Sequence, residues 1–272
     1  MRVNILGIQV DRVGMAQTLA RIEEFIHARL PRLVITPNVD HLIKARQDRE
    51  FKKIYEEADL NVPDGVPLLW AARFLGRPLV ERVNGTDLFE ALCARAAERG
   101  YRVFLLGGPP RAAAQAAKIL ERRNAGLQVA GAYAPPMGFF NDYDENQRIE
   151  AMIRKAKPDI LFVGLGAPKQ EKWIHRHMHK INVPVSIGVG ASFEYVAGAS
   201  PRAPRWMQRA GMEWLHRVLS DPSRYWKRYL VEDFKFFPLV VAQRLRNTFR
   251  KIVVAKDGRS LLFIQQQKSP HG

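Results

Sequence analysis

Two short polar turns contain the residues of this chain that are best suited to chemistry. The first, Thr36-Pro37-Asn38, follows the apolar segment 32–35, and the second, Pro63-Asp64-Gly65, follows a shorter apolar segment at 60–62. If both segments are strands of an open α/β sheet, the turns meet at the edge where ligands bind such sheets. We therefore interpret Asp64 as the reactive group, a carboxylate that could act as a base.

The local sequence of Asp64 also has a simpler explanation. Pro67 fits the first turn of a helix that continues through 68–72, so Asp64 stands at or just before a helix N-terminus. Aspartate is a favoured N-cap residue, and the positive end of the helix dipole lowers the pKa of an aspartate. Taken alone, these residues favour a cap over a base.

Three later segments repeat one arrangement, in which an apolar strand is followed by small residues and then by a helix. The strands are expected at 101–106, 159–163 and 183–187. Glycines at such a turn let a phosphate approach the backbone amides, although the loops match neither GxGxxG nor the P-loop pattern. The three units predict an α/β fold with a Rossmann-like, mostly parallel sheet and flanking helices. The glycines of the three loops are Gly107, Gly108, Gly166 and Gly190. Lys169 and Gln170 add hydrogen-bond donors to the second loop.

The composition agrees with one large α/β domain and a small appendage, since 47% of the 272 residues are hydrophobic. The single cysteine, Cys93, rules out a disulfide within the chain and is expected in the core, which fits a reducing, cytosolic compartment. We see no signal peptide and no run near the roughly 18 to 20 apolar residues that span a bilayer. His175 and His179 would share one face of a helix, as two metal ligands could. Solvent exposure explains these histidines better than metal binding does, so we expect no metal site.

The net charge of +16 calls for an anionic partner. Between Arg202 and Lys251, 12 basic residues stand against 4 acidic ones, and three of the five tryptophans lie among them. Tryptophan and tyrosine beside arginine and lysine suit an anionic bilayer surface. An amphipathic helical cap on the core and a surface for single-stranded RNA are the alternatives.

We expect three parts, namely a Rossmann-like catalytic core (1–199), a basic, aromatic-rich, membrane-associating appendage (200–251), and a short hairpin or frayed tail (252–272). The first 30 residues are expected to form a hairpin or edge strand and a covering helix. Asn84-Gly85 is expected to be a turn before a helix at 88–99 that Thr86 or Asp87 caps. Arg82 beside this turn could hold a phosphate or could simply be solvated.

As a set, these motifs resemble the WecG/TagA/CpsF family of bacterial glycosyltransferases, glycosyltransferase family 26. The resemblance covers about residues 3 to 230, and the residues after Leu230, which match poorly, are expected to be an added membrane or assembly element. The matching motifs are Thr36-Pro37-Asn38, Pro63-Asp64-Gly65, Gly85-Thr86-Asp87, the run 164–171, Gly188-Val189-Gly190-Ala191 and the run 202–215.

The resemblance implies an inverting, metal-independent transfer of a sugar from a UDP-sugar to an undecaprenyl-diphosphate-linked saccharide in cell-surface polysaccharide biosynthesis. No cofactor is implied besides the UDP-sugar co-substrate, and the sugar could be N-acetylmannosamine, its uronic acid or glucose. The appendage is implied to bind an anionic membrane surface and to help complete the active site. We therefore expect a peripheral enzyme on the cytoplasmic face of the inner membrane, without a nucleic-acid partner. Whether the chain forms a homo-oligomer stays open.

The resemblance also assigns roles to residues. In that family the aspartate of the Pro-Asp-Gly turn is the proposed general base, which is Asp64 here, with Thr36 and Asn38 near the acceptor and the base. Arg82 and Gln170 are expected at the sugar or diphosphate end, and Arg202 and Arg205 near the lipid diphosphate. The other expected substrate-binding residues are Thr86, Asp87, Gly107, Gly108, Gly166, Lys169, Gly190 and Glu194, the last of which stands where many relatives have an aspartate.

Two functions of other classes are alternatives. A nucleotide-sugar oxidoreductase would use the same fold, but the chain lacks GxGxxG. A basic RNA-binding protein without enzymatic activity would bind RNA tightly and with strong salt dependence.

Overall fold

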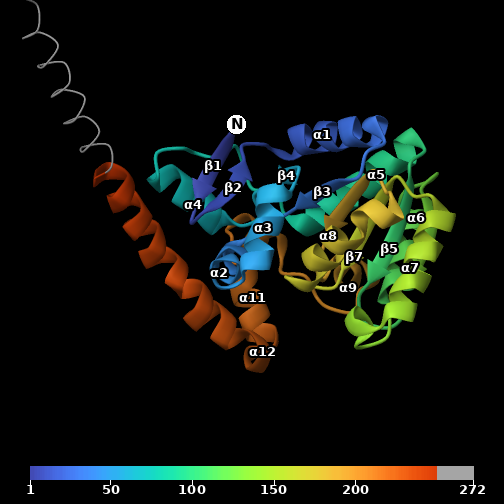
Figure 1. The fold of residues 1–272 in the computed structure, drawn as a ribbon. Helices are drawn as coiled ribbons and strands as arrows, with labels where there is room; N and C mark the ends of the chain where they lie inside the picture. Colours follow the sequence, from blue (N-terminus) through green and yellow to red (C-terminus); the bar gives the residue numbers. More distant parts are fainter. Residues whose placement is uncertain (250–272) are drawn as a thin grey trace, which may run out of the picture.

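The structure is a computed structural model that describes residues 1–249, except the side chains of Arg209 and Arg224. The hairpin or tail expected at 252–272 therefore lies outside the described residues. Within these residues, six strands form one sheet, in the order β4-β3-β8-β7-β5-β6, and every neighbouring pair is parallel (Figure 1). The predicted Rossmann-like parallel sheet is thus confirmed. The strands are β3 (Arg32–Ile35), β4 (Leu60–Asn61), β5 (Arg102–Gly107), β6 (Gln128–Tyr133), β7 (Ile160–Gly164) and β8 (Val185–Gly188).

Helices cover both faces of the sheet because alternate strand residues point to opposite sides. Leu161 and Val163 of β7 belong to one buried cluster, whereas Ile160 and Phe162 belong to the other. The first cluster includes side chains of α2 (Val39–Gln47), α3 (Arg49–Glu57), α4 (Val66–Phe74), α7 (Tyr143–Ala156) and α8 (Lys169–Ile181). The second includes side chains of α1 (Met15–Ala28), α5 (Gly85–Arg99), α6 (Ala112–Arg123) and α9 (Ser192–Ala197).

The first residues form the expected hairpin and helix. β1 (Arg2–Ile5) and β2 (Ile8–Asp11) pair antiparallel as a separate small sheet. Asp11 attaches the hairpin to the edge strand β4, since its Oδ2 accepts a hydrogen bond from the Asn61 amide at 2.9 Å. The Asn61 side chain in turn donates to the Gln9 carbonyl at 2.9 Å.

Backbone hydrogen bonds hold the polar turns together at the carboxyl edge of the sheet. The Asp64 amide donates to the Pro37 carbonyl at 2.9 Å, which joins the two turns of the opening motif. The Val83 amide donates to the Pro63 carbonyl at 2.8 Å, which brings the start of α5 to the same place. Asp64 thus lies beside α5 as well as before α4.

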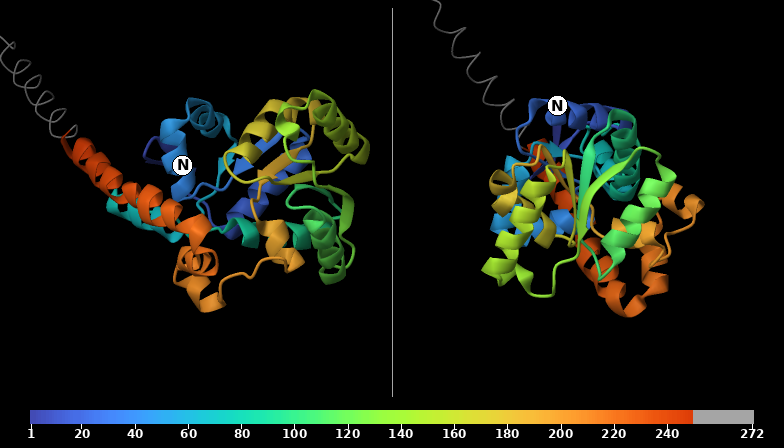
Figure 2. Two further views of the ribbon diagram at one scale, coloured as in Figure 1. Left: turned by 90° about the horizontal axis from the view of Figure 1, so that it is seen from below. Right: turned by 90° about the vertical axis from the view of Figure 1, so that its right-hand side faces the viewer.

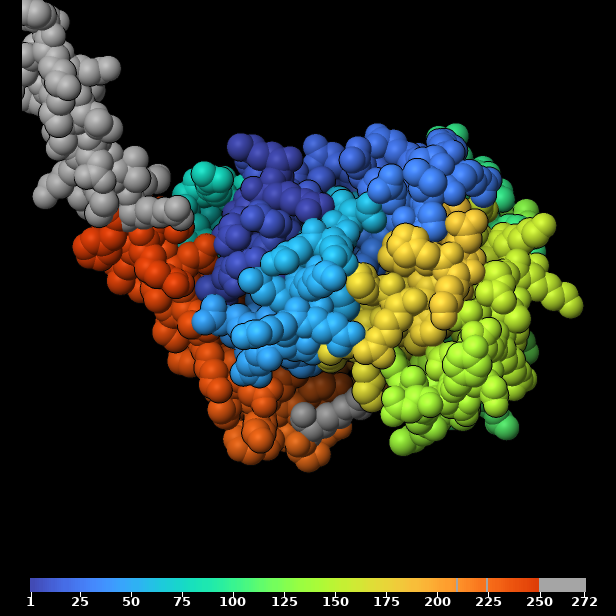
Figure 3. Space-filling model, in the orientation of Figure 1, coloured from blue at the N-terminus to red at the C-terminus, as the bar shows by residue number. Residues whose placement is uncertain are grey.

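The described part of the appendage, residues 200–249, crosses this edge of the core (Figures 2 and 3). Its last helix, residues 236–249, packs Phe236 and Val240 into the first buried cluster. Gln243 joins it to the hairpin, because its Oε1 accepts from the Leu6 amide at 2.8 Å and its Nε2 donates to the Asn4 carbonyl at 2.9 Å. The other elements are α10 (Arg205–Arg209), α11 (Glu213–Ser220), α12 (Pro222–Lys227), the π-helical turn η2 (Arg228–Glu232) and η3 (Asp233–Lys235), while η1 (Phe139–Asn141) precedes α7 in the core.

Within residues 1–249, none of the helices has the length and apolar character that crossing a bilayer requires.

The glycines at the ends of β5 and β7 allow backbone to pack on backbone. A Cβ on Gly107 would lie 2.7 Å from the Gly164 carbonyl oxygen, and one on Gly164 would lie 2.9 Å from the Gly190 carbonyl oxygen. Gly107 also has a φ of +109°. Side chains at these positions would separate the strand ends that form the floor of the site.

We expect Gly107→Ala to lower the free energy of unfolding by about 3 kcal/mol, because it combines backbone strain with a clash against a carbonyl oxygen. Gly100→Ala is the matched control, since Gly100 also has a positive φ of +71° but a Cβ there would meet no atom within 4 Å. That substitution should cost only about 1 kcal/mol. Urea unfolding of both variants measures the difference, and equal losses would contradict the packing role of Gly107.

Candidate active site

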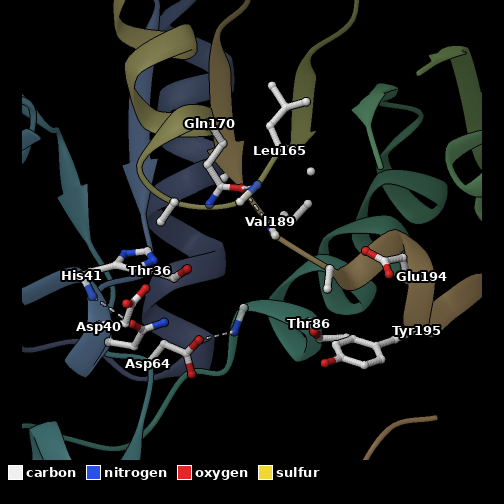
Figure 4. A pocket seen from close by; sticks show the side chains of 18 of the residues that line it. Thr36, Asp40, His41, Asp64, Thr86, Leu165, Gln170, Val189, Glu194 and Tyr195 are labelled. Atoms are coloured by element: carbon white, nitrogen blue, oxygen red, sulfur yellow. Dashed lines mark hydrogen bonds between the residues drawn. The ribbon is translucent and has the colours of Figure 1, made fainter. Parts of the chain in front are cut away.

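A cavity of about 730 Å³ opens at the carboxyl edge of the sheet, and we call it the active-site cavity. Figure 4 shows Thr36, His41 and Asp64 gathered on one side of it, with Glu194 and Tyr195 on the other. Nine of the residues predicted from the sequence line this cavity, so the fold brings together positions that are up to 158 residues apart. They are Thr36, Asn38, Asp64, Thr86, Gly108, Gly166, Gln170, Gly190 and Glu194.

Six predicted residues do not line it. Arg82 lines a neighbouring cavity, and Arg202 pairs with Asp87 at 2.6 Å. Gly107 packs against the backbone of Gly164 and does not face the cavity. Lys169 and Arg205 are exposed at the first positions of α8 and α10 and line neither cavity.

The carboxylate of Asp64 accepts two hydrogen bonds from the start of α5. Its Oδ1 accepts from Asn84 Nδ2 and its Oδ2 from the Gly85 amide, both at 3.3 Å. The N-cap of α4 is Gly65, with a φ of +115° and no side-chain cap, so the capping role that the local sequence favours for Asp64 is wrong. Glycine at 85 lets the amide come close, since a Cβ there would lie 3.3 Å from Thr36 Oγ1.

Asp64 has the properties of a base that works near neutral pH. Its carboxylate faces the cavity but is enclosed by protein, and this enclosure raises the pKa of Asp64 to about 6. The nearby carboxylate of Glu213 also raises this pKa, whereas Arg82, the Gly85 amide and Arg217 lower it. A carboxylate with such a pKa is ionised at pH 7 and is a stronger base than an ordinary aspartate.

Asn84 links Asp64 to the appendage. Its Oδ1 accepts from the amides of Thr86 and Asp87 at 2.9 and 3.4 Å, which makes Asn84 the N-cap of α5. The prediction that Thr86 or Asp87 caps this helix, and that it begins at 88, is therefore wrong, because α5 begins at Gly85. With Oδ1 occupied, the Asn84 amide nitrogen is shared between Asp64 Oδ1 and Glu213 Oε2, the latter at 3.2 Å.

Glu213 at the start of α11 pairs with two of the three arginines that were expected to bind phosphate. Arg82 Nη1 lies 3.4 Å from Glu213 Oε2 and donates to the Gln208 carbonyl at 2.9 Å. Arg202 Nε lies 3.6 Å from Glu213 Oε1, and Arg202 Nη2 donates to Asn84 Oδ1 at 3.2 Å. Both arginines thus attach the appendage to the core beside Asp64.

Gln170 attaches two glycine loops to each other. Its Oε1 accepts from the amides of Gly166 and Gly190 at 3.2 and 3.0 Å, and its Nε2 donates to Glu171 Oε1 at 2.8 Å. The Gly108 amide likewise donates to the Gly164 carbonyl at 2.7 Å. The expectation that these loops offer free amides to a phosphate, with Gln170 as a further donor, is therefore wrong for these three amides, because the protein itself uses them.

Thr86 lines the cavity and is hydrogen-bonded to Ser192 behind it. The Ser192 hydroxyl donates to the Val189 carbonyl at 2.7 Å, so Thr86 must donate its own proton to Ser192 Oγ, 3.0 Å away. This bond joins α5 to α9 and leaves the Thr86 oxygen as an acceptor.

Several residues of the cavity were not among the sequence-based candidates. Asp40 and His41 lie two and three residues after the first polar turn, and this closeness in sequence was the one local signal for them. Burial lowers the pKa of His41 to about 3, so the ring is neutral, and its Nδ1 lies 2.6 Å from the Tyr55 hydroxyl. Asp40 pairs with Lys44 at 2.8 Å.

The appendage completes the wall with charged and aromatic side chains. Arg228 lies 3.2 Å from Asp40, and the Arg217 guanidinium lies 5.7 Å from the centre of the Tyr195 ring. Tyr225 lines the same wall. Arg217 and Arg228 could not be singled out from the 12 basic residues of this segment by sequence alone, since only their place in the fold distinguishes them.

In the part of the chain that the structure describes, no three or more His, Cys, Asp or Glu residues are arranged to hold a metal ion. The Cys93 side chain is buried, and burial raises the pKa of its thiol.

Comparison with known proteins identifies relatives over nearly the whole chain. The model of the family described as "Glycosyl transferase WecG/TagA/CpsF family" matches residues 3–250. The match extends past Leu230 to residue 250, so the expectation that the residues after Leu230 match poorly is wrong for residues 231–250. This similarity favours a glycosyltransferase over the oxidoreductase and RNA-binding alternatives.

Individual relatives share one description, N-acetylglucosaminyldiphosphoundecaprenol N-acetyl-beta-D-mannosaminyltransferase. A protein of Bacillus spizizenii is 32% identical over 198 residues, which is 72% of this chain and 74% of the relative. A protein of Staphylococcus aureus strain MW2 is 30% identical over 257 residues, which is 94% of this chain and 96% of the relative.

We expect Glu213→Gln to lower the pKa of Asp64 below its value of about 6, because the substitution removes a like charge and leaves Arg82 and Arg217 in place. Carbon-13 NMR titration of the aspartate carboxyl groups, with Asp64→Asn to assign the signal, measures this shift. Glu232→Gln is the control, since this acid also belongs to the appendage but is not among the groups that act on Asp64. An unchanged Asp64 titration in Glu213→Gln would contradict the coupling.

Proposed function

The chain belongs to the WecG/TagA/CpsF family of glycosyl transferases, and on that basis we propose a substrate pair and a mechanism for it. The acceptor is an undecaprenyl-diphosphate-linked N-acetylglucosamine, and the sugar transferred is N-acetylmannosamine, as the names of the relatives state for those proteins. The donor is the corresponding UDP-sugar. The transfer inverts the anomeric carbon and needs no metal.

The enclosed carboxylate of Asp64 is the observation that supports this mechanism most directly. As the acceptor hydroxyl oxygen attacks the anomeric carbon, its proton passes to Asp64. The bond between the anomeric carbon and the diphosphate oxygen breaks, and UDP leaves with the electron pair. A single displacement of this kind inverts the anomeric centre.

Fixed cations in the cavity wall take the place of a metal at the departing diphosphate. Arg217, Arg228 and Lys44 line the active-site cavity, and preorganised charges stabilise a developing anion without reorganisation. The glycine-loop amides are not free for this task, since Gly108, Gly166 and Gly190 donate within the protein. Two of the three cations belong to the appendage, so the core alone lacks most of this charge.

The last helix of the appendage supports peripheral attachment to a membrane, for which we propose the cytoplasmic face. Opposite its buried face, residues 236–249 expose Phe237, Val241, Leu245 and Phe249 at helical spacing. Arg244 and Arg246 are exposed beside this stripe, and residues 234–249 contain no acidic residue. An exposed apolar stripe with cations at its flanks suits an anionic bilayer surface.

Asp64→Asn should lower turnover by roughly 10²- to 10⁴-fold, because the amide cannot take the acceptor proton. Transfer from UDP-N-acetylmannosamine to a polyprenyl-diphosphate-linked N-acetylglucosamine, with UDP binding measured by calorimetry, separates loss of chemistry from loss of binding. Asp144→Asn, an exposed aspartate in the first turn of α7, is the control. Wild-type turnover by Asp64→Asn would exclude Asp64 as the base, and loss of turnover in EDTA would exclude metal independence.

The membrane proposal predicts that the protein sediments with phosphatidylglycerol vesicles and much less with phosphatidylcholine vesicles. Lys235→Gln combined with Arg246→Gln should weaken binding roughly 25-fold, at about 1 kcal/mol for each cation near the surface. The control is Lys118→Gln with Arg122→Gln, which removes two exposed cations of α6 on the opposite side of the molecule (Figure 1). Equal binding by both double variants would place the membrane contact elsewhere.

A further inference from the structure

A second cavity, of about 510 Å³, lies between α4 and the appendage, and we call it the apolar groove. One wall is formed by α4, with Val66 and Trp70. The other is formed by the appendage, with Met212, Trp214 and Phe237. The groove has a fixed floor, because Gly211 packs so closely on Val66 that a Cβ there would lie 2.6 Å from its side chain.

The apolar groove meets the active-site cavity at Asp64. Six residues line both cavities, and they include the proposed base and two of the cations proposed for the diphosphate. Arg82 adds a third arginine on the groove side only. The shared residues are Asn38, Asp40, Asp64, Asn84, Arg217 and Arg228.

The side chains that line the groove also reach the surface. Trp70 is 58% exposed and Phe234 is 64% exposed, although both line the groove. Phe237 belongs both to the groove and to the exposed stripe of residues 236–249. Large apolar side chains gathered at a surface mark a place where an apolar partner binds.

The two ends of the groove require different chemistry from one ligand. The inner end is charged and polar, since it has three arginines together with the carboxylates of Asp40, Asp64, Glu213 and Asp233, while most of the remaining wall is apolar. A free nucleotide has no part that fits the apolar wall, and a simple lipid tail has no part that fits the arginines. An isoprenoid diphosphate has both, and a sugar on its diphosphate would lie beside Asp64.

We propose that the apolar groove binds the isoprene units next to the diphosphate of the acceptor, while the active-site cavity holds the donor nucleotide. This assignment rests on the proposed function, and it adds the location of the lipid chain. A cavity of this size encloses only a drug-sized part of a ligand. The rest of the chain therefore stays in the bilayer, and the acceptor reaches Asp64 sideways from the membrane through the groove.

The test compares two soluble acceptors, N-acetylglucosamine diphosphate carrying a farnesyl chain or a methyl group, without membranes. We expect the wild type to have a KM for the farnesyl acceptor that is at least about tenfold lower, because the chain leaves water for the groove. Trp70→Ala and Trp214→Ala should raise the KM for the farnesyl acceptor about tenfold and leave that for the methyl acceptor unchanged. Equal KM values for both acceptors in the wild type would overturn the proposal.

Trp206→Ala is the matched control, since Trp206 is 63% exposed in the same appendage but lines neither cavity. It should leave both KM values unchanged, and an effect equal to that of Trp70→Ala would overturn the assignment to the groove. Thermal unfolding of each variant confirms that the fold is retained.

Binding of farnesyl diphosphate alone separates this proposal from the proposed function. Calorimetry should show binding to the wild type and weaker binding to Trp70→Ala even if no sugar is transferred, a result that would contradict the proposed function but support the groove. Absence of farnesyl diphosphate binding would overturn the groove proposal. So would a dimer in analytical ultracentrifugation that Trp70→Ala dissociates and farnesyl diphosphate does not, since a second copy would then occupy the groove.

Discussion

The carboxylate of Asp64 is held by the Gly85 amide and by the side-chain amide of Asn84, and the organisation of the site depends on this contact. Asn84 can serve Asp64 because its oxygen is committed to capping α5, which turns its nitrogen toward the carboxylates. Glu213 shares that nitrogen from the appendage. The environment that raises the pKa of Asp64 is therefore built by the core and the appendage together.

The glycine loops have a different part in the site from the one their sequence indicates. Glycines after parallel strands usually suggest amides that receive a phosphate. Here the Gln170 side chain accepts hydrogen bonds from the amides of Gly166 and Gly190. The Gly164 carbonyl accepts a hydrogen bond from the Gly108 amide. The loops thus pack tightly to form a rigid floor. The positive charge comes from Lys44 and from two arginines of the appendage.

Two cavities of different character meet at one carboxylate, and this arrangement can join two substrates of different character. The polar cavity lies at the carboxyl edge of the sheet, where α/β folds bind nucleotides. The apolar groove exists only because the appendage packs against α4, at the contact of Gly211 with Val66. Family similarity that extends to residue 250 agrees with an appendage that belongs to the enzyme rather than being an addition to it.

The sequence by itself determined the parallel sheet and the hairpin, because strand periodicity and turn residues are local signals. Nine residues of the active-site cavity were predicted from the polar turns and glycine loops together with the resemblance to the family. It did not determine the cap of α5, the partners of Asp64, or which of the 12 basic residues between Arg202 and Lys251 face the site. Those depend on contacts such as that between Asn84 and Glu213, 129 residues apart. No local pattern encodes such a distance, so only the tertiary structure decided that Asp64 is an enclosed carboxylate and not a helix cap.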